Sequence, residues 1–238
     1  MSTRNYLLDP GYWWLGLRDW RRALQNLRVV LFHRGLYRIS RSVDGHISAY
    51  LGYLLHRTVR ERSAELRRPV VEVGAFKGLS TVFLSIACGN TGTRLHSFEL
   101  FQGLPEVDKS LDDPKFEKGQ FLSTQEEYEH NVRTFGRRDA VDLHVGDARR
   151  TLPSIVAENG FSVSFLDVDL YEATRALLSE LWKGARGGEV VFVHDVISRG
   201  VRQAIDEFHV ESSHAVRETR AELMTARLEF PRDLAKRR

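Results

Sequence analysis

Four side chains that can move a proton or bind a cation follow two apolar segments of the chain. Asp167 and Asp169 come after one β-rich run, and His194 and Asp195 come after another. If both runs are parallel strands of one sheet, their carboxyl ends meet at one edge, where ligands bind. Clustered carboxylates raise one another's pKa unless a cation neutralises them, and oxygen ligands suit Mg²⁺ better than Zn²⁺. The four residues therefore predict a divalent cation or a proton transfer in a cleft, although singly Asp169 reads as a helix cap and His194 as an ordinary strand-end histidine.

A glycine-bearing turn follows the first predicted strand of the α/β region. The run Val70–Ser80 indicates a strand, a turn and a helix, which places a ligand at the carboxyl end of the strand. The glycine spacing is G-x-x-x-G, which differs from the dinucleotide pattern, and the chain has no G-x-x-x-x-G-K-[ST] loop. We expect cofactor contacts in this turn from Glu72, Gly74, Phe76, Gly78 and Ser80.

Two further acids stand at strand ends. Glu99, followed by Leu100, lies about 25 residues beyond the first turn, where a carboxylate can accept both ribose hydroxyls. Asp147 lies between Gly146 and Ala148 after a third strand. Its carboxylate either accepts from an adenine amino group or caps the helix expected from Leu152 onward, and the sequence favours neither role.

Short β-rich runs alternate with helical patterns from Pro69 onward, which is typical of a parallel sheet with crossover helices. The predicted strands are 70–73, 94–98, 141–145, 162–167 and 189–193, followed by a hairpin over 215–219 and 223–230. The predicted helices are 80–87, 124–135, 152–158, 171–183 and 201–208. The expected fold is α/β, a doubly wound, Rossmann-like, mostly parallel seven-stranded sheet with a helical N-terminal extension.

The charge of the chain divides it near Pro69. Residues 1–68 contain 13 Arg and 5 acidic residues, a net of +8, whereas residues 69–238 contain 22 basic and 27 acidic residues, a net of −5. We therefore expect a helical N-terminal extension over 1–68 and a ligand-binding domain over 69–238. With a single cysteine and no apolar run of about 20 residues, the chain is expected to be a cytoplasmic protein, soluble or peripheral to a membrane.

The extension is expected to form two helices, the second over Ser42–Arg67. The first has apolar residues three and four apart with arginines between them: Trp13, Leu17, Trp20, Leu24, Leu27 and Leu31. An amphipathic helix of this kind covers a domain, pairs subunits of a homo-oligomer, or lies on an anionic membrane, and the first two roles are the commoner.

The motifs together resemble class I S-adenosylmethionine-dependent methyltransferases, and especially the macrocin O-methyltransferase family of sugar-modifying enzymes from natural-product pathways. The similarity runs from about Val70 to Phe208. Its most specific runs are FELFQGLP at 98–105, GQF at 119–121, TLP at 151–153, DVDLYEAT at 167–174 and AIDEF at 204–208.

The resemblance implies a cofactor and residue roles. The turn at Glu72–Ser80 would hold the methionine part of S-adenosylmethionine, Glu99 would bind the ribose, and Asp147 would lie by the adenine. Asp167 would contribute to both the cofactor site and the catalytic site, and residues 1–68 would help to build the acceptor pocket.

The resemblance also implies a Mg²⁺ ion on the strand-end residues Asp167, His194 and Asp195. Our hypothesis for the reaction is that Asp169 or His194 accepts the proton of the acceptor. The family usually has a glycine where Val168 stands and a second acid where His194 stands. A His-Asp pair is similar to that of other small methyltransferases, in which His194 would serve as a base without a metal.

The expected function is O-methylation of a hydroxyl on a sugar or a glycosylated natural product such as an antibiotic, assisted by Mg²⁺. The first alternative is a metal-independent methyltransferase of a small molecule, a phenol or a lipid-linked glycan, and the second is a non-catalytic membrane-peripheral or scaffold protein. The glycine spacing disfavours a nicotinamide oxidoreductase, and no motif for a flipped base indicates a nucleic-acid partner. The polar segment Pro105–Phe121 is expected to be a mobile loop that closes over the acceptor.

Overall fold

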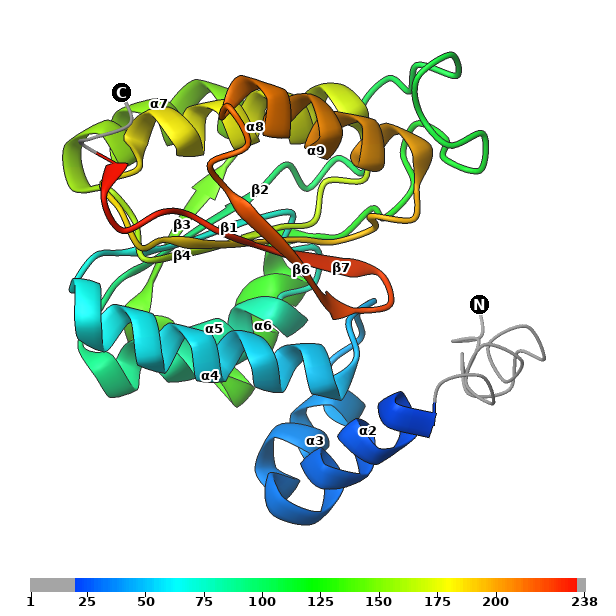
Figure 1. Cartoon of the computed structure of the whole chain (residues 1–238). Coiled ribbons are helices and arrows are strands. Elements are labelled where there is room, and N and C mark those ends of the chain that lie inside the picture. Colours follow the sequence, from blue (N-terminus) through cyan, green and yellow to red (C-terminus); the bar gives the residue numbers. More distant parts are fainter. Residues whose placement is uncertain (1–19, 235–238) are drawn as a thin grey trace.

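The computed structural model describes residues 20–234, in which seven strands form one sheet (Figure 1). The strands are β1 (Val70–Val73), β2 (Leu95–Glu99), β3 (Val141–Val145), β4 (Val163–Leu166), β5 (Val190–Val193), β6 (Arg217–Glu222) and β7 (Thr225–Glu229). Their order is β3-β2-β1-β4-β5-β7-β6. The first five pair in parallel, and β7 runs antiparallel to β5 and β6. The predicted doubly wound, mostly parallel, seven-stranded sheet is confirmed.

The three central strands are buried along their whole length. β1, β4 and β5 read VVEV, VSFL and VVFV, and each of their residues is buried, as expected for parallel strands covered on both faces. From β1 the chain proceeds outward to β2 and β3, and it then returns to place β4 on the other side of β1. The gap between the carboxyl ends of β1 and β4 is the point where ligands bind in such sheets.

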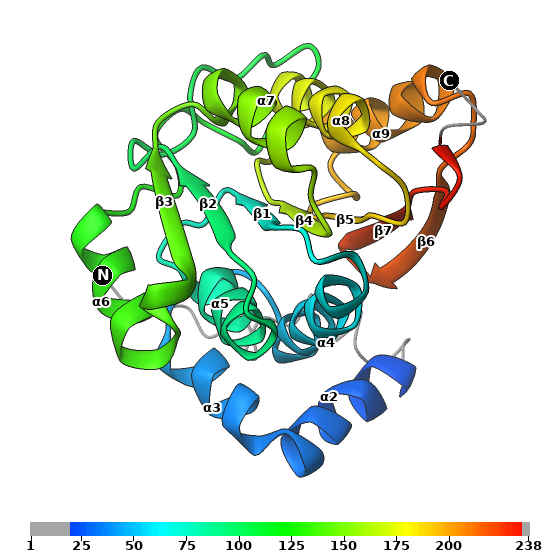
Figure 2. The same cartoon turned by 90° about the vertical axis from the view of Figure 1, so that its left-hand side faces the viewer.

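Helices cover the two faces of the sheet (Figure 2). One layer holds α4, α5 and α6, and the other holds α7, α8 and α9, while α2 and α3 lie outside the first layer. The helices are α2 (Trp20–Phe32), α3 (Arg34–Ser42), α4 (Ala49–Leu66), α5 (Leu79–Thr91), α6 (Gln125–Phe135), α7 (Ala148–Asn159), α8 (Tyr171–Gly184) and α9 (Arg199–Glu211). Each layer has its own apolar core, with Leu55, Val82 and Phe165 in the first and Leu177 and Val191 in the second.

The N-terminal extension departs from its prediction. The helix expected over Ser42–Arg67 is shorter than predicted, because α4 begins only at Ala49, and a separate helix, α3, ends at Ser42. Ser48 explains the new start, since its hydroxyl accepts a 3.0 Å hydrogen bond from the amide of Leu51 and caps α4. The sequence did not predict α3. Of the expected amphipathic helix, the residues before Trp20 lie outside the described part of the chain.

The segment Pro105–Phe121 is anchored to the domain. The Asp112 carboxylate is buried and accepts a 2.7 Å hydrogen bond from the amide of Tyr171 at the start of α8. Arg199 donates to the carbonyl of Asp112 and to neighbouring carbonyls, and Phe116 is buried in a small apolar cluster. A sequence this polar gives no sign of such anchors, and closure of this segment over the acceptor stays a prediction.

Candidate active site

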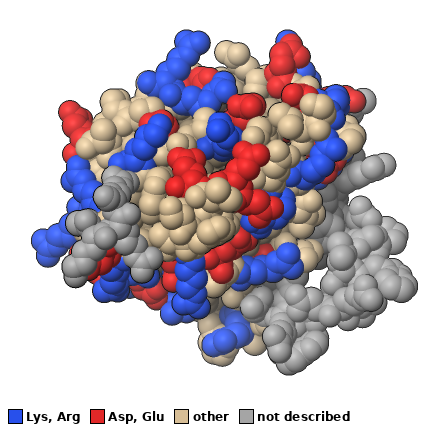
Figure 3. Space-filling view, turned by 45° about the horizontal axis from the view of Figure 1, so that its top comes forward, with Lys and Arg blue, Asp and Glu red and all other residues tan. Residues whose placement is uncertain are grey.

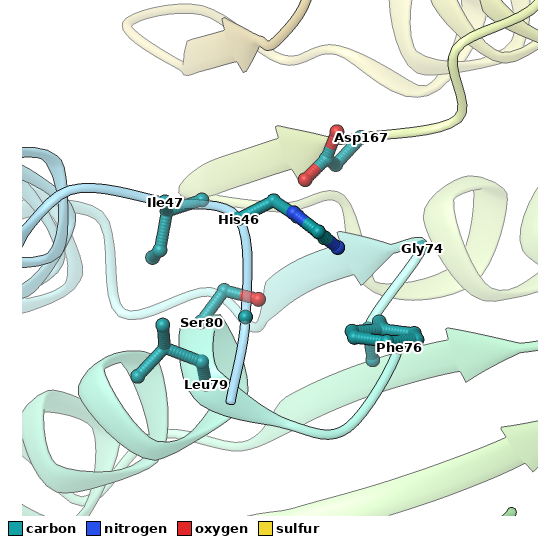
Figure 4. Close-up of a pocket in the computed structure, with 9 residues that line it drawn as sticks. His46, Ile47, Gly74, Phe76, Leu79, Ser80 and Asp167 are labelled. Atoms are coloured by element: carbon teal, nitrogen blue, oxygen red, sulfur yellow. The ribbon is translucent and has the colours of Figure 1, made fainter. Parts of the chain in front are cut away.

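A small cavity lies between the carboxyl ends of β1 and β4 (Figure 4). It is lined by Gly45, His46, Ile47, Gly74, Ala75, Phe76, Leu79, Ser80 and Asp167. Gly74 has a φ of +85°, and a Cβ placed there would lie 1.8 Å from the carbonyl oxygen of Asp167. Only glycine can hold that position without moving the two strands apart.

Glu99 connects the ends of β1 and β2. One carboxylate oxygen accepts from the amide of Phe76 at 2.6 Å, and the other accepts from the amides of Leu100 and Phe101 at 2.8 and 3.1 Å. Burial raises the pKa of Glu99, and these backbone amides oppose that effect. Because a carboxylate oxygen has two lone pairs, the oxygen bound by Phe76 retains room for one more donor, such as a ribose hydroxyl.

Asp147 fulfils the capping role that the sequence left open. Its carboxylate accepts from the Arg149 amide at 3.0 Å and caps α7, which begins at Ala148 and not at the predicted Leu152. The Arg149 guanidinium lies 2.7 Å from the same carboxylate and lowers the pKa of Asp147. The adjoining Gly146 has a φ of +125° and open space where its Cβ would be. A contact of Asp147 with adenine stays a prediction.

Glu72 is enclosed and does not line the cavity. One of its carboxylate oxygens accepts from the hydroxyls of Thr81 and Ser97 at 2.6 and 2.7 Å, and the other has no hydrogen-bond partner. Burial raises the pKa of Glu72. Gly78 also faces away from the cavity, since it precedes α5 and its Cβ would meet Tyr128 at 3.2 Å.

The strand-end residues meet as the sequence predicted. His194 Nδ1 lies 3.1 Å from a carboxylate oxygen of Asp167 and 2.9 Å from one of Asp195. Burial by itself would lower the pKa of His194, but the two carboxylates more than offset it and raise the pKa well above its usual value. His194 Nδ1 thus lies within hydrogen-bonding distance of both carboxylates, and a role of His194 as a base stays a prediction.

Asp169 completes this cluster and does not cap α8. It is buried, and burial together with the charges of Asp167 and Asp195 raises its pKa well above the usual value. Burial would also raise the pKa of Asp195, but the hydrogen bond from His194 lowers it overall. The side chains of Asp169 and Asp195 therefore interact at the same edge of the sheet.

Left-handed backbone conformations gather at the same edge of the sheet. Phe76, Phe101, Asp169 and Asp195 have φ values of +49°, +54°, +61° and +52°. Each costs about 1–2 kcal/mol for a residue with a Cβ. Strain of this kind persists where the surrounding structure fixes the geometry of a site.

A divalent ion fits the Asp167–His194–Asp195 cluster in its spacing. One ligand atom from each residue lies within 4.8 Å of the others, and the two N···O distances match the roughly 3 Å between neighbouring ligands of an octahedral ion with bonds of about 2.1 Å. The carboxylates suit Mg²⁺, whereas the imidazole adds a preference for transition metals. Metal binding would require His194 to lose its proton.

His46 is a residue of the site that the sequence did not reveal. It comes from the connection between α3 and α4, and its side chain extends between Phe76 and Asp167 (Figure 4). Its ring centroid lies 5.4 Å from that of Phe76 and 5.2 Å from that of Phe121. No motif marks His46, because the sequence placed it inside a helix.

A comparison with protein families identifies the core of the chain. A family model described as a methyltransferase domain matches residues 71–196, more than half of the chain. The chain belongs to this methyltransferase family. The expected resemblance to class I methyltransferases is confirmed. No curated protein sequence matches the methyltransferase.

Solved structures of other methyltransferases share its fold. The O-methyltransferase NovP is 20% identical, with a TM-score of 0.64 over 76% of this chain and 80% of NovP. The calicheamicin methyltransferase CalS11 is 17% identical, with a TM-score of 0.61 over 83% of this chain and 91% of CalS11. TomG from Streptomyces achromogenes, solved with SAM and involved in tomaymycin synthesis, is 22% identical, with a TM-score of 0.54 over 82% of this chain and 87% of TomG. Identities this low establish a common fold.

Proposed function

We propose that the chain is an S-adenosylmethionine-dependent O-methyltransferase whose acceptor is a hydroxyl of a sugar or a glycosylated natural product. The observation that carries the proposal is a cavity lined by Gly74, Phe76 and Asp167 at the carboxyl edge of the sheet. Glu99 binds the Phe76 amide, and Asp167 belongs to the Asp167–His194–Asp195 cluster. Membership of the methyltransferase family supports the reaction class. CalS11, a TDP-rhamnose 3'-O-methyltransferase of calicheamicin biosynthesis, and TomG, an O-methyltransferase of tomaymycin synthesis, support the acceptor class.

In the proposed reaction the chain aligns an acceptor hydroxyl with the methyl group of the sulfonium. The hydroxyl oxygen attacks the methyl carbon, the C–S bond breaks with its electron pair passing to sulfur, and the products are a methyl ether and S-adenosylhomocysteine. The hydroxyl proton goes to Asp167, whose carboxylate lines the cavity. His194 holds Asp167 and Asp195 in place, because its own proton bridges them.

With His194 deprotonated, Asp167, His194 and Asp195 would instead hold a divalent ion, Mg²⁺ being the one we propose. Such an ion supplies a Lewis acid that lowers the pKa of a bound hydroxyl. The metal-independent alternative rests on His194, whose Nδ1 lies within hydrogen-bonding distance of both Asp167 and Asp195.

The first test is calorimetric titration of the protein with S-adenosylhomocysteine, with NAD as the control ligand. We expect binding of the adenosyl ligand alone, and Glu99→Gln to weaken it about tenfold through the loss of a charged acceptor. Binding of NAD but not of the adenosyl ligand would contradict the proposal.

The second test measures methyl transfer to vicinal-diol sugars, with Mg²⁺ or with EDTA. Asp167→Asn is expected to lower turnover at least 100-fold, as expected for loss of a general base, and to weaken adenosyl binding far less. Asp139→Asn, at an exposed position outside the site, is the matched control. Full turnover in EDTA would support the metal-independent alternative. Full turnover by Asp167→Asn would show that Asp167 is not the proton acceptor.

A further inference from the structure

The outer face of α2 presents large apolar side chains to solvent. Leu24 and Leu27 are 49% exposed, Leu31 is 51% exposed, and Phe32, at the end of the helix, is 74% exposed. At 3.6 residues per turn, the three leucines lie within about 60° of one another and roughly opposite Val29. Val29 is buried. The helix therefore packs on the protein through its Val29 side and leaves the leucines outside.

The same two helices carry charge of one sign. Residues Trp20–Ser42, which form α2 and α3, contain six arginines and no acidic residue. The arginines whose side chains are described as exposed are Arg28, Arg34, Arg38 and Arg41. The first acid after α3, Asp44, is 3.2 Å from the ammonium of Lys77. On the face covered by α7–α9, in contrast, basic and acidic side chains are interspersed (Figure 3).

We propose that this leucine-and-arginine surface of α2 and α3 docks on an anionic lipid bilayer. A helix that joins an apolar stripe to basic side chains lies in the membrane interface, with leucines at the acyl boundary and arginines among anionic headgroups. A second copy docked through the same face would bring arginines against arginines. A nucleic acid would satisfy the arginines but leave the leucines in water. Lipid is the partner that satisfies both.

The docking is peripheral, and it lies next to the candidate active site. Among residues 20–234 no helix has the length and apolar character needed to cross a bilayer. The connection that follows α3 supplies Gly45, His46 and Ile47 to the cavity wall. A bilayer bound at α2 and α3 would therefore lie beside the cavity. The proposal does not depend on the reaction proposed above.

The test is sedimentation of the full chain with vesicles of phosphatidylcholine alone or mixed with phosphatidylglycerol. We expect binding to the mixed vesicles only, weakened by salt because the arginine contribution is screened. Leu27→Asp should abolish most of the binding. The double variant Arg28→Glu, Arg34→Glu should lower the partition coefficient at least 25-fold, since each basic residue near the surface contributes about fivefold.

Two matched variants control for the substitutions themselves. Val210→Asp, at a 68% exposed site on α9, and Arg217→Glu, on β6, are expected to bind vesicles like the wild type. Circular dichroism and thermal unfolding confirm that all variants are folded. Equal binding to both vesicle types, or unchanged binding of the α2 and α3 variants, would overturn the proposal. The proposal would also be overturned if the wild type is a dimer that does not bind vesicles and the Leu27→Asp variant is a monomer. That result would assign the surface to contact with a second copy of the chain.

Discussion

Replacement of Gly74 by alanine tests the closeness of β1 and β4 where they form the cavity. The new Cβ would lie 1.8 Å from the Asp167 carbonyl oxygen, although non-bonded heavy atoms normally stay about 3.5 Å apart. The strands must then separate by more than an ångström. Left-handed strain costs about 1–2 kcal/mol and overpacking about 1–3 kcal/mol, so we expect Gly74→Ala to lose about 2–5 kcal/mol of unfolding free energy.

Gly188→Ala separates the two contributions. Gly188 has the same φ of +85°, but the nearest atom to its Cβ is Leu66 Cδ2 at 3.6 Å, an ordinary contact. This variant should lose only the strain, about 1–2 kcal/mol. Urea denaturation gives both values, and titration with S-adenosylhomocysteine should show at least tenfold weaker binding for Gly74→Ala alone. Equal destabilisation by the two variants, or unchanged binding by Gly74→Ala, would refute the reasoning.

Three further predictions concern buried or paired carboxylates. Asp112→Ala should lose about 1–2 kcal/mol of unfolding free energy, because the Tyr171 amide loses its acceptor, and its Pro105–Phe121 segment should be cleaved in limited proteolysis. Asp112→Asn keeps an acceptor oxygen, so its segment should resist cleavage. Arg138 lowers the pKa of Glu129, so this ion pair contributes about 1 kcal/mol of unfolding free energy above the pKa of Glu129 in the unfolded chain. The contribution is lost as the pH falls through the pKa of Glu129 in the folded protein. The unfolding free energies of Glu129→Gln and wild type, measured by urea denaturation, should therefore converge in acid. Burial raises the pKa of Glu72, so the wild type loses unfolding free energy as the pH rises through the pKa of Glu72 in the folded protein. Glu72→Gln lacks this loss, so its unfolding free energy should rise relative to that of the wild type as the pH rises. A difference between the two proteins that does not change with pH would contradict this prediction.

The sequence predicts the sheet well because its signals are local. β1 and β3 have the predicted bounds, since both runs are rich in valine and each is followed by a glycine. The meeting of Asp167 with His194 also follows from sequence, because parallel strands align their carboxyl ends.

What the sequence does not reveal depends on contacts between distant residues. Nothing near Asp112 indicates that it accepts from Tyr171, which is 59 positions away. The break before α4 depends on the Ser48 cap, and a single serine within an apolar helical pattern is a weak signal. His46 reaches the cavity because it lies in the connection before α4 and not in a helix. Since the sequence did not reveal the Ser48 cap, it did not reveal His46 as a site residue either.

The left-handed residues at the sheet edge limit how the protein can be stabilised. Glycine or asparagine at Asp169 or Asp195 would relax the backbone, so a screen for thermal resistance should recover such changes. Each would also remove a carboxylate from the cluster around His194. At these two positions a substitution that raises the melting temperature would therefore lower the activity of the candidate site. A variant library ranked by melting temperature alone would enrich for inactive protein.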